Sequence, residues 1–177
     1  MPKSLEMKKV LSHDPNLCTG CMYCMVACST YNEGSASLSK ARLQIIRHEG
    51  HALTRIDQED ELLFALVGCP QCEDPICSTV CPVAAIRKDD TTGAMVIDRD
   101  KCVGCKMCLM TCYFGAISFN EKVGTAFKCE LCGGDPQCVR FCQPGALTYI
   151  PAGQVSLRTR MQTARKIMRG LVDTKEP

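Results

Sequence analysis

The chain has 177 residues, which is enough for one domain or two very small ones. It carries 21 Lys and Arg against 19 Asp and Glu, a net charge of +2, so its bulk charge favours neither nucleic acid nor an acidic substrate. The 46% of hydrophobic residues includes 16 cysteines, and there is no tryptophan, so an ordinary side-chain core is thinly supplied. Cysteines at this density are typical of a disulfide scaffold or of a metal protein.

The N-terminal residues and the length of the apolar runs indicate in which cellular compartment the protein is expected. The first ten residues contain neither an apolar segment nor a pair of arginines, as secretory and twin-arginine signals require. The longest apolar run, 62–67, is too short to cross a bilayer. We therefore expect a cytoplasmic protein without a membrane span, the alternative being export on a signal-bearing partner. Because the cytosol keeps thiols reduced, the cysteines indicate metal rather than disulfides.

The cysteines fall into four groups of four, with none left over. In the first and third groups the gaps between successive cysteines are two, two and three residues, whereas in the second and fourth the middle gap grows to four and five. The groups are Cys18, Cys21, Cys24 and Cys28, then Cys69, Cys72, Cys77 and Cys81, then Cys102, Cys105, Cys108 and Cys112, and finally Cys129, Cys132, Cys138 and Cys142.

This spacing matches the ligand pattern of [4Fe–4S] clusters. Three thiolates from one short loop can cover one face of the cube, and the fourth cysteine begins a helical turn that points it elsewhere. In two-cluster ferredoxins the fourth cysteine of such a run ligates the other cluster. Zinc sites usually join two cysteine pairs across a longer gap, which fits this pattern poorly. The spacing predicts iron–sulfur clusters, and a zinc-binding module is the minor alternative.

Between the first two groups lies an insertion with two strand-like segments, 42–47 and 52–56, joined around Gly50. We interpret it as a solvated hairpin covering a cluster, with a partner-facing surface as the alternative. The three histidines, His13, His48 and His51, are not expected to be ligands, because sixteen thiolates already match four cubes.

A repeat follows the other three groups. Alanine and then isoleucine or leucine stand four and five residues after the last cysteine of each group, and two of the repeats continue to Gly93 and Gly124. The unit predicts a cluster loop, a helical turn, a strand, a glycine turn and a second strand. The alanine and its apolar neighbour either cover a cube or are ordinary strand-start residues. The pairs are Ala85 and Ile86, Ala116 and Ile117, and Ala146 and Leu147.

The C-terminal segment, Val155–Val172, places apolar residues near helical spacing beside a basic face. We expect it to dock a partner subunit, the alternative being a helix packed on its own domain or a tail. Lys101, Lys106 and Lys128 each stand beside or between the cysteines of a group. We interpret these three as surface lysines, the alternative being that their charge raises a local reduction potential.

With these groups, residues 8–150 resemble the four-cluster ferredoxin-type electron-transfer subunits of multisubunit oxidoreductases. Examples are the iron–sulfur subunits of dimethyl-sulfoxide-reductase-type and formate-dehydrogenase complexes and the small subunits of tungsten aldehyde oxidoreductases. Hydrogenase- and carbon-monoxide-dehydrogenase-associated ferredoxins are similar. Unlike the family pattern, no proline follows Cys28 or Cys112, which changes no ligand. The cysteine pattern is specific for the superfamily and only weakly specific for a partner enzyme.

The resemblance implies an α+β fold of two tandem bacterial-type ferredoxin lobes with a cluster-dominated core. One lobe would combine 7–40 with 125–150 and the other would span 62–120, with 41–61 inserted and 151–177 as a basic C-terminal helix or tail. Each lobe would hold two [4Fe–4S] clusters, four in all. The implied ligand sets are Cys18, Cys21, Cys24 and Cys142 (first set), Cys69, Cys72, Cys77 and Cys112 (second set), Cys102, Cys105, Cys108 and Cys81 (third set), and Cys129, Cys132, Cys138 and Cys28 (fourth set).

The implied function is a relay of single electrons between a catalytic subunit and an acceptor. The catalytic subunit would be a tungsten or molybdenum pterin oxidoreductase, for example of the aldehyde oxidoreductase type. The acceptor would be a further redox subunit or a ferredoxin-, quinone- or NAD-linked partner. No nucleophile–base pair or phosphate loop is visible, so the chain is not expected to be catalytic alone or to bind nucleic acid. A free polyferredoxin diffusing between enzymes is the alternative.

Overall fold

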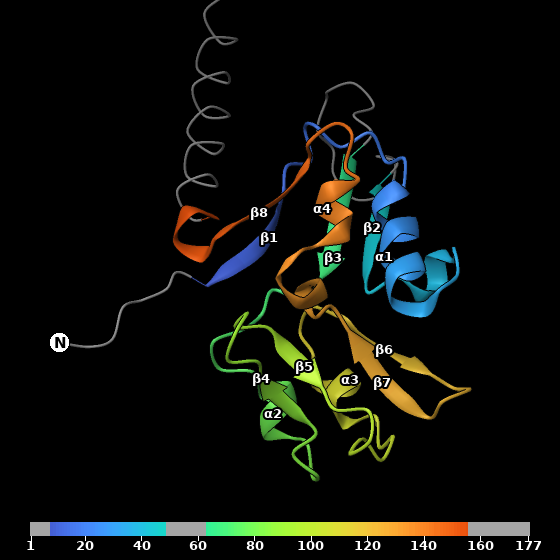
Figure 1. Cartoon of the computed structure of the whole chain (residues 1–177), viewed down its shortest axis with the longest axis vertical. Coiled ribbons are helices and arrows are strands. Elements are labelled where there is room, and N and C mark those ends of the chain that lie inside the picture. The colour runs from blue at the N-terminus through green and yellow to red at the C-terminus, as the bar shows by residue number, and fades with distance from the viewer. Residues whose placement is uncertain (1–7, 49–62, 156–177) are drawn as a thin grey trace, which may run out of the picture.

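The computed structural model describes residues 8–48 and 63–155, an α+β arrangement of short strands and short helices (Figure 1). In chain order its elements are β1 (Lys9–His13), α1 (Tyr23–Glu33), η1 (Leu38–Lys40), β2 (Leu43–His48), β3 (Leu63–Gly68), α2 (Ile76–Thr79), β4 (Ile86–Lys88), β5 (Met95–Ile97), α3 (Met107–Thr111), β6 (Ile117–Asn120), β7 (Thr125–Lys128), η2 (Leu131–Gly134), α4 (Gln137–Arg140) and β8 (Leu147–Pro151), where η marks a 3₁₀ helix.

The upper half of the molecule in Figure 1 joins the two ends of the described chain. β1 and β8 pair antiparallel, with Lys9 opposite Pro151 and His13 opposite Leu147. α1 and α4, which contain cysteines of the first and fourth groups, lie against each other. The strand before the first cysteine group, β1, therefore lies beside the strand after the last group, β8, and the chain returns to the half in which it began.

β2 confirms the first strand expected in the insertion, but its partner is β3. The two pair antiparallel, with Leu43 opposite Gly68 and His48 opposite Leu63. Phe64 of β3 is buried in one cluster with Leu43, Cys24 and Cys28. By pairing and burial β3 belongs with the upper half, although the sequence assigned 62–68 to the other lobe. The second expected strand, 52–56, lies outside the described residues.

The lower half consists of two similar hairpins, each preceded by a cluster loop and a short helix. β4 pairs with β5 and β6 pairs with β7, which confirms the strands and glycine turns expected from the repeat. Gly93 and Gly124 have φ of 69° and 75°, a left-handed conformation that glycine adopts without strain. α2 and α3 lie together, and Ile86, Ile97 and Ile117 share a buried cluster with Cys108. β7, assigned by the sequence to the first lobe, is therefore part of this half.

Candidate metal centres

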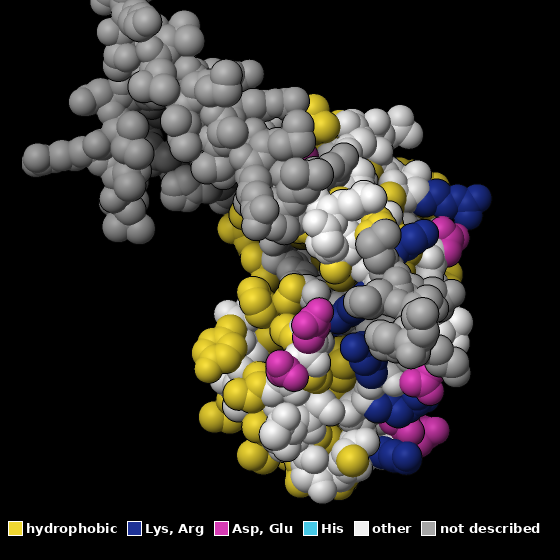
Figure 2. All heavy atoms as spheres, turned by 90° about the vertical axis from the view of Figure 1, so that its left-hand side faces the viewer, with side chains coloured by type: hydrophobic (Ala, Val, Ile, Leu, Met, Phe, Trp, Pro, Cys, Tyr) yellow, Lys and Arg dark blue, Asp and Glu magenta, His cyan; other side chains and the backbone are white. Residues whose placement is uncertain are grey.

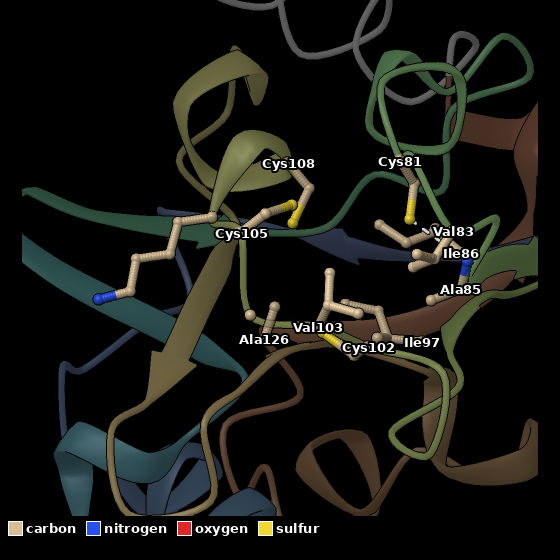
Figure 3. Close-up of a pocket in the computed structure, with 12 residues that line it drawn as sticks. Cys81, Val83, Ala85, Ile86, Ile97, Cys102, Val103, Cys105, Cys108 and Ala126 are labelled. Carbon is tan, nitrogen blue, oxygen red and sulfur yellow. Dashed lines mark hydrogen bonds between the residues drawn. The ribbon is translucent and has the colours of Figure 1, made fainter.

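Four cysteines from two groups line one cavity in the lower half. They are Cys81, at the end of the second group, and the first three cysteines of the third group, Cys102, Cys105 and Cys108. Figure 3 shows Cys81 facing Cys105 and Cys108 across this space, with Cys102 at its lower edge. The remaining wall is mostly apolar, with Val83, Ala85, Ile86, Ile97, Val103 and Ala126 among its residues. The cavity therefore brings together all members of the third set.

Two further cavities have the same construction. The cysteines of the first set line one of them, in which Cys142 from the last group joins the loop of the first group. The cysteines of the second set line the other, in which Cys112 joins the loop of the second group. In each case three sulfur-bearing side chains come from one loop and one comes from the end of another group.

The members of the fourth set are the most deeply placed. Cys28, Cys129 and Cys138 are buried, and Cys132 is half-buried. Burial, followed by the neighbouring thiols of Cys129, Cys28, Cys132 and Cys24, raises the pKa of Cys138. Burial also raises the pKa of Cys129 to about 12, and the neighbouring thiols of Cys69 and Cys28 add to this shift. These thiols lose their protons at neutral pH only when a cation or metal stabilises the thiolate.

The neighbours of these thiols define an order of the four sets. Cys138 of the fourth set shares a buried cluster with Cys24 of the first set, and Cys69 of the second set packs against the buried cluster that contains Cys129 of the fourth. Cys108 of the third set packs with Cys77 and Cys112 of the second. The sets therefore follow one another in the order first, fourth, second, third. The first and third sets stand at the ends and contain the two exposed cysteines, Cys21 and Cys105.

The alanine–isoleucine repeat lies at the start of strands and beside the cysteine cavities. Ile86, Ile117 and Leu147 begin β4, β6 and β8, and each lines a cysteine cavity. The repeat also donates hydrogen bonds to sulfur: the Ala85 N–H to Cys81 Sγ at 3.2 Å and the Leu147 N–H to Cys142 Sγ at 3.4 Å. Such bonds stabilise negative charge on a ligating sulfur and are among the factors that set cluster potentials.

Cys28 receives the equivalent bonds from other residues. The Arg42 N–H lies 3.3 Å from Cys28 Sγ, and Asn32 Nδ2 lies 3.6 Å from the same atom. The Arg42 guanidinium donates to Glu130 Oε2 at 2.8 Å, next to Cys129, which fastens the start of β2 to the fourth cluster loop. Sequence reasoning missed Arg42 as a neighbour of the fourth set, because it was interpreted as part of a hairpin.

The chemistry of these sites fits iron–sulfur clusters. All sixteen cysteines are free, so none is engaged in a disulfide. Among the described residues, no three His, Cys, Asp or Glu side chains are grouped to hold a single metal ion. Sets of four thiols around mostly apolar cavities provide soft ligands and the dry surroundings that tune cluster potentials. If clusters bind, these residues hold them, and the clusters supply one-electron chemistry.

The three lysines that stand beside cysteines differ from one another. Lys101 is exposed and pairs with Asp98 at 3.7 Å, and Lys106 is exposed and pairs with Glu121 at 2.9 Å. Their interpretation as surface residues is confirmed. For Lys128 that interpretation is wrong, because all four residues of β7 are buried and the Lys128 side chain lines the cavity of the second set.

The histidines and the C-terminal segment add little to these sites. His13 ends β1 and lines the cavity of the first set, and burial lowers its pKa. The His48 side chain, His51 and 156–172 lie outside the described residues, so the basic helix stays a prediction. Within 8–48 and 63–155, no helix is long and apolar enough to cross a membrane.

Two family models match the chain. The model described as a 4Fe-4S dicluster domain matches residues 61–152, and one described as a 4Fe-4S binding domain matches 10–32. Together they cover all four cysteine groups. The chain belongs to the 4Fe-4S dicluster family of iron–sulfur electron-transfer subunits.

The chain is similar to three proteins that are named as subunits or chains of oxidoreductases. The chain is 34% identical over 154 residues to the thiosulfate reductase electron transfer subunit PhsB of Salmonella typhi, covering 82% of this chain and 77% of that protein. It is 33% identical over 150 residues to one of the chains of the anaerobic dimethyl sulfoxide reductase of Escherichia coli, covering 80% and 73%. It is 38% identical over 145 residues to the NADH-dependent phenylglyoxylate dehydrogenase subunit beta of Aromatoleum evansii, covering 82% of this chain and 31% of that protein.

Proposed function

We propose that the chain holds four [4Fe–4S] clusters, one on each ligand set, and relays single electrons along the order first, fourth, second and third. In this proposal the upper and lower halves are two ferredoxin-like lobes, and within each lobe the two cysteine groups exchange their fourth cysteines. The observation that carries it is the convergence of cysteines from two groups on each of three cavities. A relay needs sites in series, and the buried fourth set lies between the first and second sets.

We further propose that the chain works as a subunit beside a catalytic oxidoreductase subunit of molybdenum or tungsten pterin type. Three relatives are named as subunits or chains of oxidoreductases, one of them as an electron transfer subunit. The second partner would be a further redox subunit or a ferredoxin-, quinone- or NAD-linked acceptor. We place the complex in the cytoplasm, where sixteen free thiols stay reduced.

Exposed apolar side chains support a docking role. On the lower half, hydrophobic side chains gather on one side with a few acidic side chains among them, and the Lys and Arg side chains gather on the other side (Figure 2). Met110 in α3 and Tyr113 directly after Cys112 are 86% and 87% exposed. Grouped exposed apolar residues are typical of protein interaction sites. This surface favours a subunit over the second candidate, a free polyferredoxin.

The test is anaerobic purification of the tagged chain from its native source. We expect a large catalytic chain to co-purify with it, and substrate of that chain to reduce the clusters. Replacing Met110 and Tyr113 by serine should weaken co-purification, whereas the control Leu38→Ser, an exposed apolar residue on the upper half, should not. Isolation of the unaltered chain as a monomer with intact clusters would favour the free carrier.

A further inference from the structure

Lys128 is a fully buried cation at the junction of the two halves. Only 1% of its surface is exposed, and its ammonium donates hydrogen bonds to the carbonyl oxygens of Met95 and Cys129, the latter at 2.8 Å. Its side chain lines the cavity of the second set, and the next residue, Cys129, belongs to the fourth set. The ammonium therefore stands between the two inner sets.

No carboxylate balances this charge among the residues that the structure describes. The other buried cation, Arg42, is paired with Glu130 at 2.8 Å and lies 3.8 Å from Glu33. Burying an ammonium without a counter-charge is costly, so a protein that keeps one places negative charge nearby. Around Lys128 the groups that can carry negative charge are thiols: Cys129 is the next residue, and Cys77 lines the same cavity as Lys128.

A second buried polar side chain fixes the position of the ammonium. Gln71, in the second cluster loop, donates from Nε2 to the Cys129 carbonyl at 3.0 Å and accepts the Met95 N–H at 2.8 Å. Gln71 and Lys128 therefore share both partners, Met95 and Cys129. This network ties the loops of the two inner sets to β5 and leaves the ammonium little freedom to turn away.

We propose that Lys128 tunes the middle of the relay: its ammonium stabilises the reduced state of the two inner clusters and so raises their reduction potentials. The inference rests on the proposed function. Reduction adds negative charge to a cluster, and a fixed cation in a low-dielectric interior favours that state. Lys128 touches no reacting atom in the structure and acts through charge alone.

The test is a redox titration of the loaded chain followed by electron paramagnetic resonance. In Lys128→Gln, two of the four potentials should fall, with the equilibrium constant for reduction reduced at least tenfold, which is 59 mV for one electron. Lys128→Arg should keep the potentials of the unaltered chain. The matched control is Lys101→Gln, which removes a lysine that also directly precedes a cysteine but is 63% exposed. It should shift no potential by a comparable amount.

A purely structural role predicts another pattern. Gln71→Met breaks the same network without changing charge, so it should lower stability but leave the potentials nearly unchanged. Should Lys128→Gln fail to load, Gln71→Glu adds a negative charge at the same junction with the lysine in place, and the inner potentials should fall. Equal shifts in Lys128→Gln and Gln71→Met, or unchanged potentials in Gln71→Glu, would overturn the proposal. Absence of clusters from the unaltered chain would instead refute the proposed function.

Discussion

The outer cluster loops, of the first and third cysteine groups, and the inner ones, of the second and fourth, make the same backbone turn with different residues. The residue before the second cysteine has φ of 66° and 72° in the outer loops, at Gly20 and Gly104, and 58° and 56° in the inner loops, at Gln71 and Leu131. Glycine adopts this left-handed conformation freely, whereas other residues are strained in it. At this position the inner loops accept that strain, whereas in the outer loops Met22 and Lys106, directly after the second cysteine, adopt the left-handed conformation.

The difference follows from what each loop faces. The cysteines after Gly20 and Gly104 are exposed, whereas Gln71 and Leu131 are among the most deeply buried residues of the described chain. At the junction of the halves a side chain at this position contributes packing or hydrogen bonds that glycine lacks. The ends of the relay therefore have glycine at this position, each followed by an exposed cysteine, and its middle has side chains there that help to hold the halves together.

The largest expected effect comes from removing an inner ligand. Cys129→Ser should lose the fourth cluster and, because Cys129 is a buried residue next to the network of Gln71 and Lys128, should lower the free energy of unfolding by more than about 4 kcal/mol. Cys105→Ser should lose one outer cluster and loosen the packing of α3 beside it, but leave the junction intact. Iron content and thermal unfolding under anaerobic conditions measure both. Equal losses of stability in the two variants would contradict the distinction between inner and outer loops.

The outer turns should not tolerate a side chain. A Cβ at Gly104 would lie 2.5 Å from the Gly124 carbonyl oxygen, a backbone atom that cannot turn away, and φ there is 72°. Gly104→Ala should therefore lower the free energy of unfolding by about 3 kcal/mol, from the left-handed conformation and the overlap together. The control is Gly115→Ala, where φ is 57° but nothing lies within 4 Å, and about 1 kcal/mol is expected. A larger loss for Gly115→Ala than for Gly104→Ala would show that the overlap is unimportant.

The inner turns should depend on their side chains instead. Gln71→Ala removes the acceptor of the buried Met95 N–H and one donor to the Cys129 carbonyl. Leaving such groups unpaired costs about 1 to 3 kcal/mol, which denaturant unfolding of the loaded chain can measure. A half-buried amide of the same half, Asn120, serves as the comparison, since its side chain accepts only turn N–H groups at 3.1 and 3.3 Å. A smaller loss of stability in the Gln71 variant than in the Asn120 variant would show that the Gln71 side chain does not hold the two halves together.

The smallest effect should be a gain in stability. Residues 84, 115 and 145 stand at the same position of the repeat and all have positive φ, but the first is an alanine, with φ of 48°. Ala84→Gly should relieve strain and raise the free energy of unfolding by about 1 kcal/mol, read as a rise in melting temperature. A fall in melting temperature would mean that the alanine methyl group contributes more by packing than it costs in strain.

Much of the fold and of the candidate site could be predicted because it depends on the spacing of cysteines and glycines along the chain. The four cysteine groups, the strands after Cys81, Cys112 and Cys142, and the glycine turns follow from local pattern. The partner of β2 did not, because β3 is an almost uninterrupted apolar run with no alternation to assign a face. The burial of Lys128 was likewise hidden, since lysine is rarely buried and only the tertiary packing of β7 places it inside. Gln71 and Arg42 act through contacts between distant segments, which no local pattern records.

The most direct test of the central claim is elemental analysis of the chain prepared under argon. Four clusters on one polypeptide require about sixteen iron atoms and as much acid-labile sulfide per chain. A preparation rich in zinc, or one that after full reconstitution holds only about half that iron, would contradict the account.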